Sequence, residues 1–197
     1  MAQALHYLKE SPSQTAGPYV HIGLTPNAVG LGGVFPHDLG AVMLTPAVKG
    51  ERIRIEGRIF DGVGQPIRDG LVEIWQADAQ GVYGTNSDGF TGWGRSATDL
   101  ETGVFAFDTI KPGRVPMPDG RMQAPHVSLW IAARGVNLAL HTRLYFPDEA
   151  AANASDPLLM QLEHKSRVAT LIARRDGAVL LFDIRLQGED ETVFLDI

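Results

Sequence analysis

Residues 52–60 carry the clearest alternation of polar and apolar side chains in this sequence. Arg52-Ile53-Arg54-Ile55-Glu56-Gly57-Arg58-Ile59-Phe60 has the period of two that indicates a strand with one buried face. Shorter apolar runs predict further strands at residues 71–75, 104–108, 127–133, 141–146, 168–173 and 178–186. Short strands in this number predict an all-β fold, a β-sandwich of two sheets.

Asp-Gly pairs mark the turns between the predicted strands. They stand at 61–62, 69–70, 88–89, 119–120 and 176–177. Asp tolerates a positive φ and Gly adopts it freely, so each pair favours a tight turn. Arg175-Asp176-Gly177 lies between two apolar runs and predicts a hairpin. Helical structure is predicted at residues 149–163, where Pro157 divides it into two short pieces.

Residues 1–50 differ from the rest of the chain. They are rich in Gly, Pro, Ser, Thr and Ala, and their hydrophobic pattern is weak. Apolar residues such as Tyr19, Ile22 and Phe35 are nevertheless too frequent for a solvated linker. We therefore predict a single domain, residues 1–197, in which an extended N-terminal arm (1–50) packs on another surface, such as a second chain, and 51–197 form the sandwich.

Composition excludes several classes of function. The formal net charge is −6 and there is no basic block, which argues against binding to nucleic acid or to a membrane surface. No apolar stretch is long enough to span a membrane. With no cysteine, the chain has no disulfide, no thiolate metal site and no cysteine nucleophile. The N-terminus also lacks a signal-peptide pattern, so we expect a cytoplasmic protein.

Common catalytic motifs are absent. The chain has no Gly-x-Ser-x-Gly elbow, no phosphate loop and no HExxH, and its six histidines include no pair at i, i+2 or i, i+4. The residue pattern taken by itself indicates a β-sandwich with an apolar arm and leaves the reaction open.

Several motifs in register resemble the intradiol ring-cleavage dioxygenases. They are Gly57–Gly62, Pro66-Ile67, Val72–Tyr83, Gly94-Arg95, Gly103-Val104-Phe105, Thr109–Gly113, Pro125–Ser128 and Leu144-Tyr145-Phe146. The resemblance implies a β-sandwich, a non-haem ferric ion and the opening of catechols by O2 between the two hydroxylated carbons.

The same resemblance implies a metal site of two Tyr and two His, a donor set that suits Fe(III). One Tyr should follow Lys111-Pro112-Gly113, where Val115 stands, and the second His should stand at Ser128. The other Tyr should lie in 86–93, which contains none, and an arginine usually stands at the position of Gln123. Only His126 is left, so we expect this chain to bind no metal and to have no catalytic residue of its own.

This pattern of loss resembles the iron-free chains found in two-chain members of the family. Residues 15–24, 133–137 and 182–189 extend the resemblance over nearly the whole chain. It implies that a partner chain binds Fe(III) and that the substrate is a catechol with a carboxylate. Arg134 would contact that carboxylate, since guanidinium pairs with carboxylate through two parallel donors. The residues implied to line the pocket from the arm are Thr15, Gly17, Pro18 and Tyr19.

Two alternatives give these residues other roles. In a non-catalytic β-sandwich binding module without an iron-bearing partner, Arg134 is a solvated residue beside a turn and 15–19 is a packed turn. A complete dioxygenase of identical chains would need iron here, which Val115 and Ser128 contradict.

Overall fold

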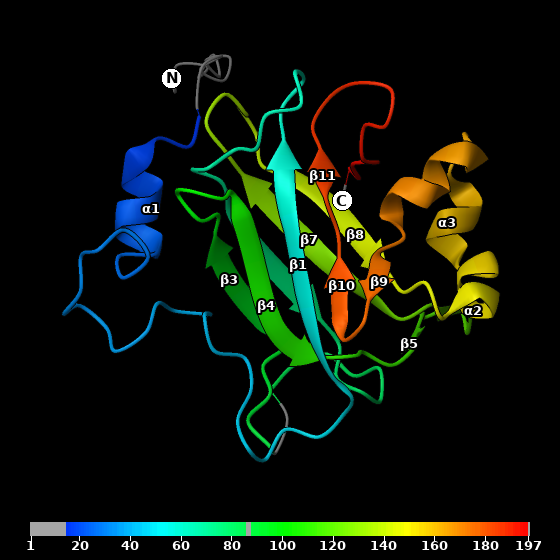
Figure 1. Ribbon diagram of the computed structural model, residues 1–197. Helices are drawn as coiled ribbons and strands as arrows, with labels where there is room; N and C mark the ends of the chain where they lie inside the picture. The colour runs from blue at the N-terminus through cyan, green and yellow to red at the C-terminus, as the bar shows by residue number, and fades with distance from the viewer. Residues whose placement is uncertain (1–14, 86–87, 197) are drawn as a thin grey trace, which may run out of the picture.

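The computed structural model describes residues 15–85 and 88–196, and two β-sheets stacked face to face dominate this part of the chain (Figure 1). The predicted fold class is confirmed. In one sheet β1 (Arg52–Phe60) pairs antiparallel with β4 (Val104–Ile110). The other edge of β1 receives β10 (Val179–Leu181) and β11 (Ile184–Arg185), both parallel to it. The hairpin predicted at 175–177 joins β10 to β9 (Arg174–Asp176).

The second sheet has the strand order β3-β2-β7-β8, and all its pairs are antiparallel. Its strands are β3 (Trp93–Ala97), β2 (Leu71–Gln76), β7 (His126–Ala132) and β8 (Leu140–Tyr145). A short hairpin of β5 (Val115–Pro116) and β6 (Met122–Gln123) precedes β7.

The alternating residues of both sheets meet in one apolar core. Side chains at most 5% exposed include Ile53, Ile55, Ile59, Val72, Ile74, Phe105, Phe107, Val127, Leu129, Ile131, Leu144 and Leu180. Because side chains of a strand alternate between its faces, the other positions of β2, β7 and β8 point away from this core. That outer face carries the candidate site.

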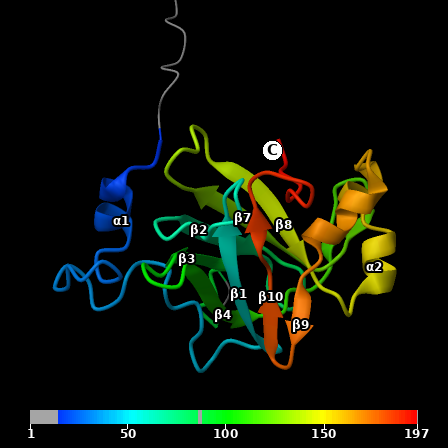
Figure 2. The same ribbon diagram turned by 45° about the horizontal axis from the view of Figure 1, so that its top comes forward.

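Short helices flank the sandwich. α1 (Pro18–Leu24) lies on one side, and α2 (Ala150–Ala154) and α3 (Pro157–Gln161) lie on the other (Figure 2). The predicted division of 149–163 at Pro157 is confirmed. None of the helices in the described residues is long and apolar enough to cross a lipid bilayer.

The arm contains one short helix, because Pro18 stands at the first position of α1, where its missing N–H costs nothing. Two local expectations are wrong. Residues 168–173 belong mostly to a 3-10 helix, η1 (Lys165–Leu171), rather than to a strand. The predicted strand 178–186 is interrupted at Asp183, whose carboxylate accepts a hydrogen bond from the Arg58 N–H at 3.0 Å. The arm residues 1–14 lie outside the described part of the chain.

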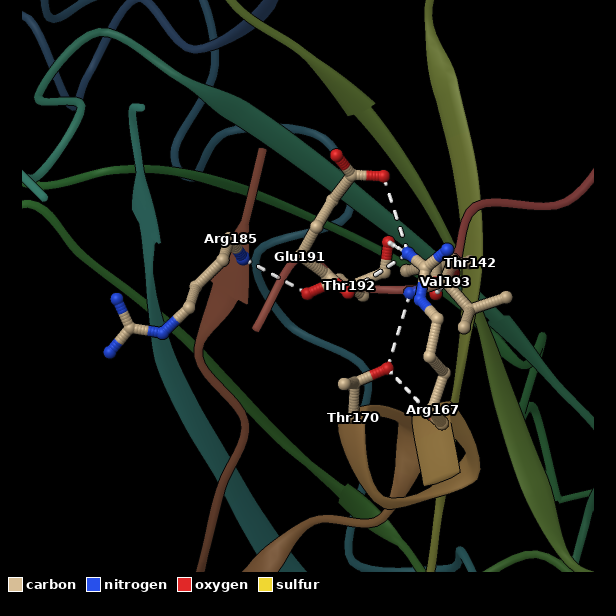
Figure 3. Close-up of polar contacts among 7 residues, drawn as sticks. All are labelled: Thr142, Arg167, Thr170, Arg185, Glu191, Thr192 and Val193. Carbon is tan, nitrogen blue, oxygen red and sulfur yellow. Dashed lines mark hydrogen bonds and ion pairs between the residues drawn. The ribbon is translucent and has the colours of Figure 1, made fainter. Parts of the chain in front are cut away.

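Side-chain hydrogen bonds tie the end of the chain to the sandwich (Figure 3). Arg167 on η1 donates to the carbonyl oxygen of Glu191 at 3.1 Å, and Thr170 Oγ1 accepts from the Val193 N–H at 3.2 Å. From β8, the hydroxyl of Thr142 donates to the Val193 carbonyl at 2.7 Å. The C-terminal segment thus joins η1 to the second sheet.

Asp156 joins elements that are distant in sequence. Its side chain is fully buried and accepts from the N–H groups of Leu158 and Leu159, which caps α3. The same carboxylate accepts from the Ala124 N–H at 2.8 Å and from the Tyr145 hydroxyl at 3.1 Å. One carboxylate therefore fixes the helix, the end of β8 and the segment that enters β7.

Asp156→Ala should lower the free energy of unfolding by about 3–5 kcal/mol, because buried donors lose their acceptor and α3 loses its cap. Urea unfolding of the full chain measures the change. Asp119→Ala is the matched control, since that carboxylate bonds only to the nearby Arg121 at the exposed surface. Similar losses for the two variants would contradict the role of Asp156.

Candidate functional site

A tyrosine and a histidine meet at the edge of the second sheet. The Tyr83 hydroxyl lies 3.2 Å from Nε2 of His126, the first residue of β7. Nδ1 of His126 lies 2.8 Å from the carbonyl oxygen of Ala124, which can only accept a hydrogen bond. Nδ1 therefore carries the ring proton, and Nε2 accepts the proton of the Tyr83 hydroxyl.

Two glycines bring the Tyr83 segment to this place. The carboxylate of Asp78 accepts from the N–H groups of Gln80 and Val82 and closes a turn in which Gly81 has a φ of +82°. A Cβ on Gly81 would collide with the carbonyl oxygen of Arg114. Gly113 likewise packs against the backbone of this turn and donates to the Asp78 carbonyl at 2.8 Å. The 78–83 turn and the segment that leads to Val115 are therefore locked together.

Two stacked aromatic rings extend the site across the outer face of the sheet. The Trp75 and Tyr83 rings are nearly parallel, with centroids 6.1 Å apart. The Trp75 side chain is 45% exposed, and Trp93 and Trp130 are half-buried, so none of the tryptophans belongs to the inner core. Their place on the outer face makes them available for an interface rather than for the core.

The donor set that the resemblance implies is half complete. Tyr83 and His126 are present, but Val115 is a buried aliphatic residue and Ser128 stands two residues after His126 on β7. Nowhere in the described residues do three or more His, Asp or Glu side chains gather as metal ligands. One phenol and one imidazole do not satisfy a ferric ion, so the residues present do not fit the metal.

Tyr83 was missed by the sequence analysis, which expected the second tyrosine at 86–93. Residues 86–87 lie outside the described part of the chain, and 88–93 hold no tyrosine. The sequence did point to Tyr83, because this residue ends the Val72–Tyr83 run that carries the resemblance. Only the turn at Asp78, which folds this segment back beneath Trp75, brings Tyr83 to His126.

Burial keeps the pair neutral. Burial and, to a smaller extent, the nearby Arg143 guanidinium lower the pKa of His126 to about 4, against the opposing effects of the Ala124 carbonyl and Asp156. Burial raises the pKa of Tyr83, and Arg143 partly offsets this. At neutral pH the site holds an uncharged imidazole and an uncharged phenol beside one fixed positive charge.

The arm and the Arg134 turn form a second cluster. Thr15 Oγ1 accepts from the Gly135 N–H at 2.7 Å and lies 3.3 Å from the Ala133 carbonyl oxygen, to which its hydroxyl donates. Arg134, between these two residues, is 65% exposed and pairs with Asp69. The structure thus joins two of the five residues that the resemblance placed at the substrate, Thr15 and Arg134.

The remaining three lie at the start of α1. Gly17 is its N-cap, Pro18 is its first residue and the Tyr19 side chain is 83% exposed. α1 is anchored by His21, whose Nε2 donates to the Gly70 carbonyl at 3.0 Å. Because Gly70 follows Asp69, the helix and the Arg134 ion pair share one turn. Beside that turn a pocket of about 350 Å³ is lined by Asp61, Ile67, Arg134, Leu140, Leu186 and Gln187, among others.

Sequence comparisons relate the chain to dioxygenases. The family model described as "Dioxygenase" matches residues 36–188. The protocatechuate 3,4-dioxygenase alpha chain of Pseudomonas putida is 45% identical, over 98% of this chain and 98% of that relative. The alpha chain of Burkholderia cepacia is 40% identical, over 96% and 98%. The beta chain of Burkholderia cepacia is 35% identical, over 73% of this chain and 67% of the relative.

Solved structures with the same fold are also dioxygenases. The dioxygenase domain of a carbohydrate-binding fusion protein from Streptomyces sp. SirexAA-E superposes with a TM-score of 0.53 at 25% identity, over 78% of this chain and 88% of that one. Catechol 1,2-dioxygenase from Pseudomonas arvilla C-1 gives 0.55 at 25% identity, over 78% and 59%.

The low pKa of His126 predicts a loss of stability in mild acid. The unfolded chain binds a proton at this residue below about pH 6.5, whereas the folded chain binds it only near pH 4. The contribution of His126 to the free energy of unfolding should therefore be fully present above pH 6.5 and be lost as the pH falls towards 4. We expect a loss of about 2 kcal/mol between pH 7 and pH 5. Urea unfolding at several pH values should show this extra slope in the wild type and not in His126→Gln. Equal slopes would refute it.

Proposed function

Because the chain belongs to the intradiol ring-cleavage dioxygenase family, we propose that it is the alpha chain of a protocatechuate 3,4-dioxygenase. Paired with a beta chain, it would act on 3,4-dihydroxybenzoate. Both atoms of O2 enter the product, 3-carboxy-cis,cis-muconate, and the bond between the two hydroxylated carbons is broken. With no cysteine in the chain, we place the enzyme in the reducing cytoplasm.

The observation that carries this proposal is the incomplete donor set. Tyr83 and His126 lie together, but Val115 and Ser128 offer no phenolate and no imidazole. The ferric ion and its ligands would then belong to the partner chain. The alpha chain alone would be inactive and would contribute the shape of the pocket and the stability of the assembly.

Arg134 would bind the carboxylate of the substrate. Its guanidinium is exposed, its turn is held by Thr15, and Asp69 balances its charge while no substrate is bound. Substrate and partner would remove water from this ion pair, which strengthens a charge-assisted hydrogen bond. Gly17, Pro18 and Tyr19, at the start of α1, would line the substrate pocket that this chain forms together with its partner.

The arm (residues 1–50) would contact the partner chain. Between residues 19 and 42 the exposed apolar side chains are Tyr19, Ile22, Leu31, Val34, Phe35, Leu39 and Val42. A surface this apolar on so short a segment is typical of an interface rather than of a solvated loop. Trp75 on β2 and Val82 in the 78–83 turn are further exposed apolar side chains.

The direct test is the stoichiometry of iron and chains in the protein purified gently from its own cells. We expect one iron per pair of this chain and a second chain of similar size. A lone chain without iron would instead support the binding module, and iron on the lone chain would overturn the ligand assignment.

Arg134→Ala in the purified complex should weaken binding of 3,4-dihydroxybenzoate by about 10- to 150-fold, since it removes a charge-assisted pair. Binding of catechol, which has no carboxylate, should change little. The affinity of Arg134→Lys should lie between those of the wild type and Arg134→Ala, because lysine keeps the charge but lacks the two parallel donors of guanidinium. Titration calorimetry with both ligands measures this, and Arg68→Ala, an exposed arginine nearby, is the control. Equal losses for both ligands would remove the carboxylate role.

A further inference from the structure

Arg143 is a cation without a carboxylate partner beside the Tyr83–His126 pair. It stands on β8, half-buried, and one terminal nitrogen donates to Oε1 of Gln123 at 2.8 Å. Its Nε is buried and has no hydrogen-bond partner in the described residues. The ion pairs found among those residues do not include Arg143. The guanidinium also hydrogen-bonds to Tyr145, but a buried Nε without a partner is costly.

The strand register connects Arg143 to both positions where a metal donor is missing. It lies directly opposite Ser128 in the β7–β8 pair. Gln123, its hydrogen-bond partner, lies directly opposite Val115 in the β5–β6 pair. It also lies close enough to Tyr83 and His126 for its charge to act on both. Register thus ties Arg143 directly to Ser128 and, through Gln123, indirectly to Val115.

We propose that Arg143 takes the place of the missing metal ion and keeps metal out of this chain. A fixed positive charge among the donors repels a second cation. One of its nitrogens also bonds β8 to Gln123 on β6. This inference rests on membership of the family and not on the existence of a partner chain.

The position of the cation matters, and not only its presence. Gln123 is on β6 and Arg143 on β8, with a hydrogen bond between them. We infer that moving the positive charge from position 143 to position 123 would allow a metal ion to bind beside Tyr83 and His126.

The test restores one donor and then removes the guanidinium. Ser128→His gives a site of Tyr83, His126 and a new imidazole, all neutral or able to lose a proton. S128H by itself should bind Co2+ only weakly, because Arg143 remains. S128H/R143Q should bind one Co2+ per chain above the wild-type background, at least about tenfold more tightly than S128H. Visible absorption of cobalt during titration of the protein in its purified assembly gives the affinity and the type of ligands.

Three controls make the result specific. S128H/R143K keeps a positive charge and should bind as weakly as S128H. The exchange Q123R/R143Q, combined with S128H, keeps the net charge and a partner for hydrogen bonding, and should bind Co2+ like S128H/R143Q even if the latter folds poorly. Tyr83→Phe in the binding variant should weaken the site and so place the metal there.

Equal cobalt affinity in S128H and S128H/R143Q, with both proteins folded by thermal unfolding, would overturn the proposal. So would a failure of the folded exchange variant to bind. Neither result depends on how many chains the assembly contains, so a failure here is distinct from a failure of the proposed function.

Discussion

A buried carboxylate must have its lone pairs satisfied, and the order of the candidate site depends on how Asp156 meets this requirement. Its oxygens bind the Ala124 N–H, the carbonyl of Ala124 binds the His126 ring, and the ring binds the Tyr83 hydroxyl. Each bond decides the orientation of the next group. A helix cap on one side of the sandwich thus determines which ring nitrogen of His126 faces the remnant of a metal site.

The two faces of the second sheet have different roles, because alternate residues of each strand point to opposite faces. Inward side chains close the core with the first sheet, and outward ones carry Trp75, Ser128 and Arg143. A donor such as Ser128 can therefore change without disturbing the core. This separation explains how the chain keeps a dioxygenase fold while its own donor set is incomplete.

Much of the fold was predictable, because alternation and Asp-Gly turns are local signals. β1 and the hairpin around Asp176 follow directly from them. β3 was missed since Gly94, which packs against Met43, breaks the apolar pattern. η1 was mistaken for a strand because a short apolar run does not distinguish the two. At the site, the lost donors were visible from motif spacing, but the approach of Tyr83 to His126 and the place of Arg143 depend on turn geometry and strand register.

The parallel pairing of β1 with β10 has a consequence for biosynthesis. β1 ends at residue 60 and β10 begins at residue 179. At ribosomal speeds of about 5–20 residues per second, roughly 6–24 s pass between them. During that time one edge of an isoleucine-rich strand has no neighbour from its own chain, and such edges pair readily with other strands. The nascent chain is therefore exposed to aggregation through the middle and most of its synthesis, the period in which a chaperone could protect this edge.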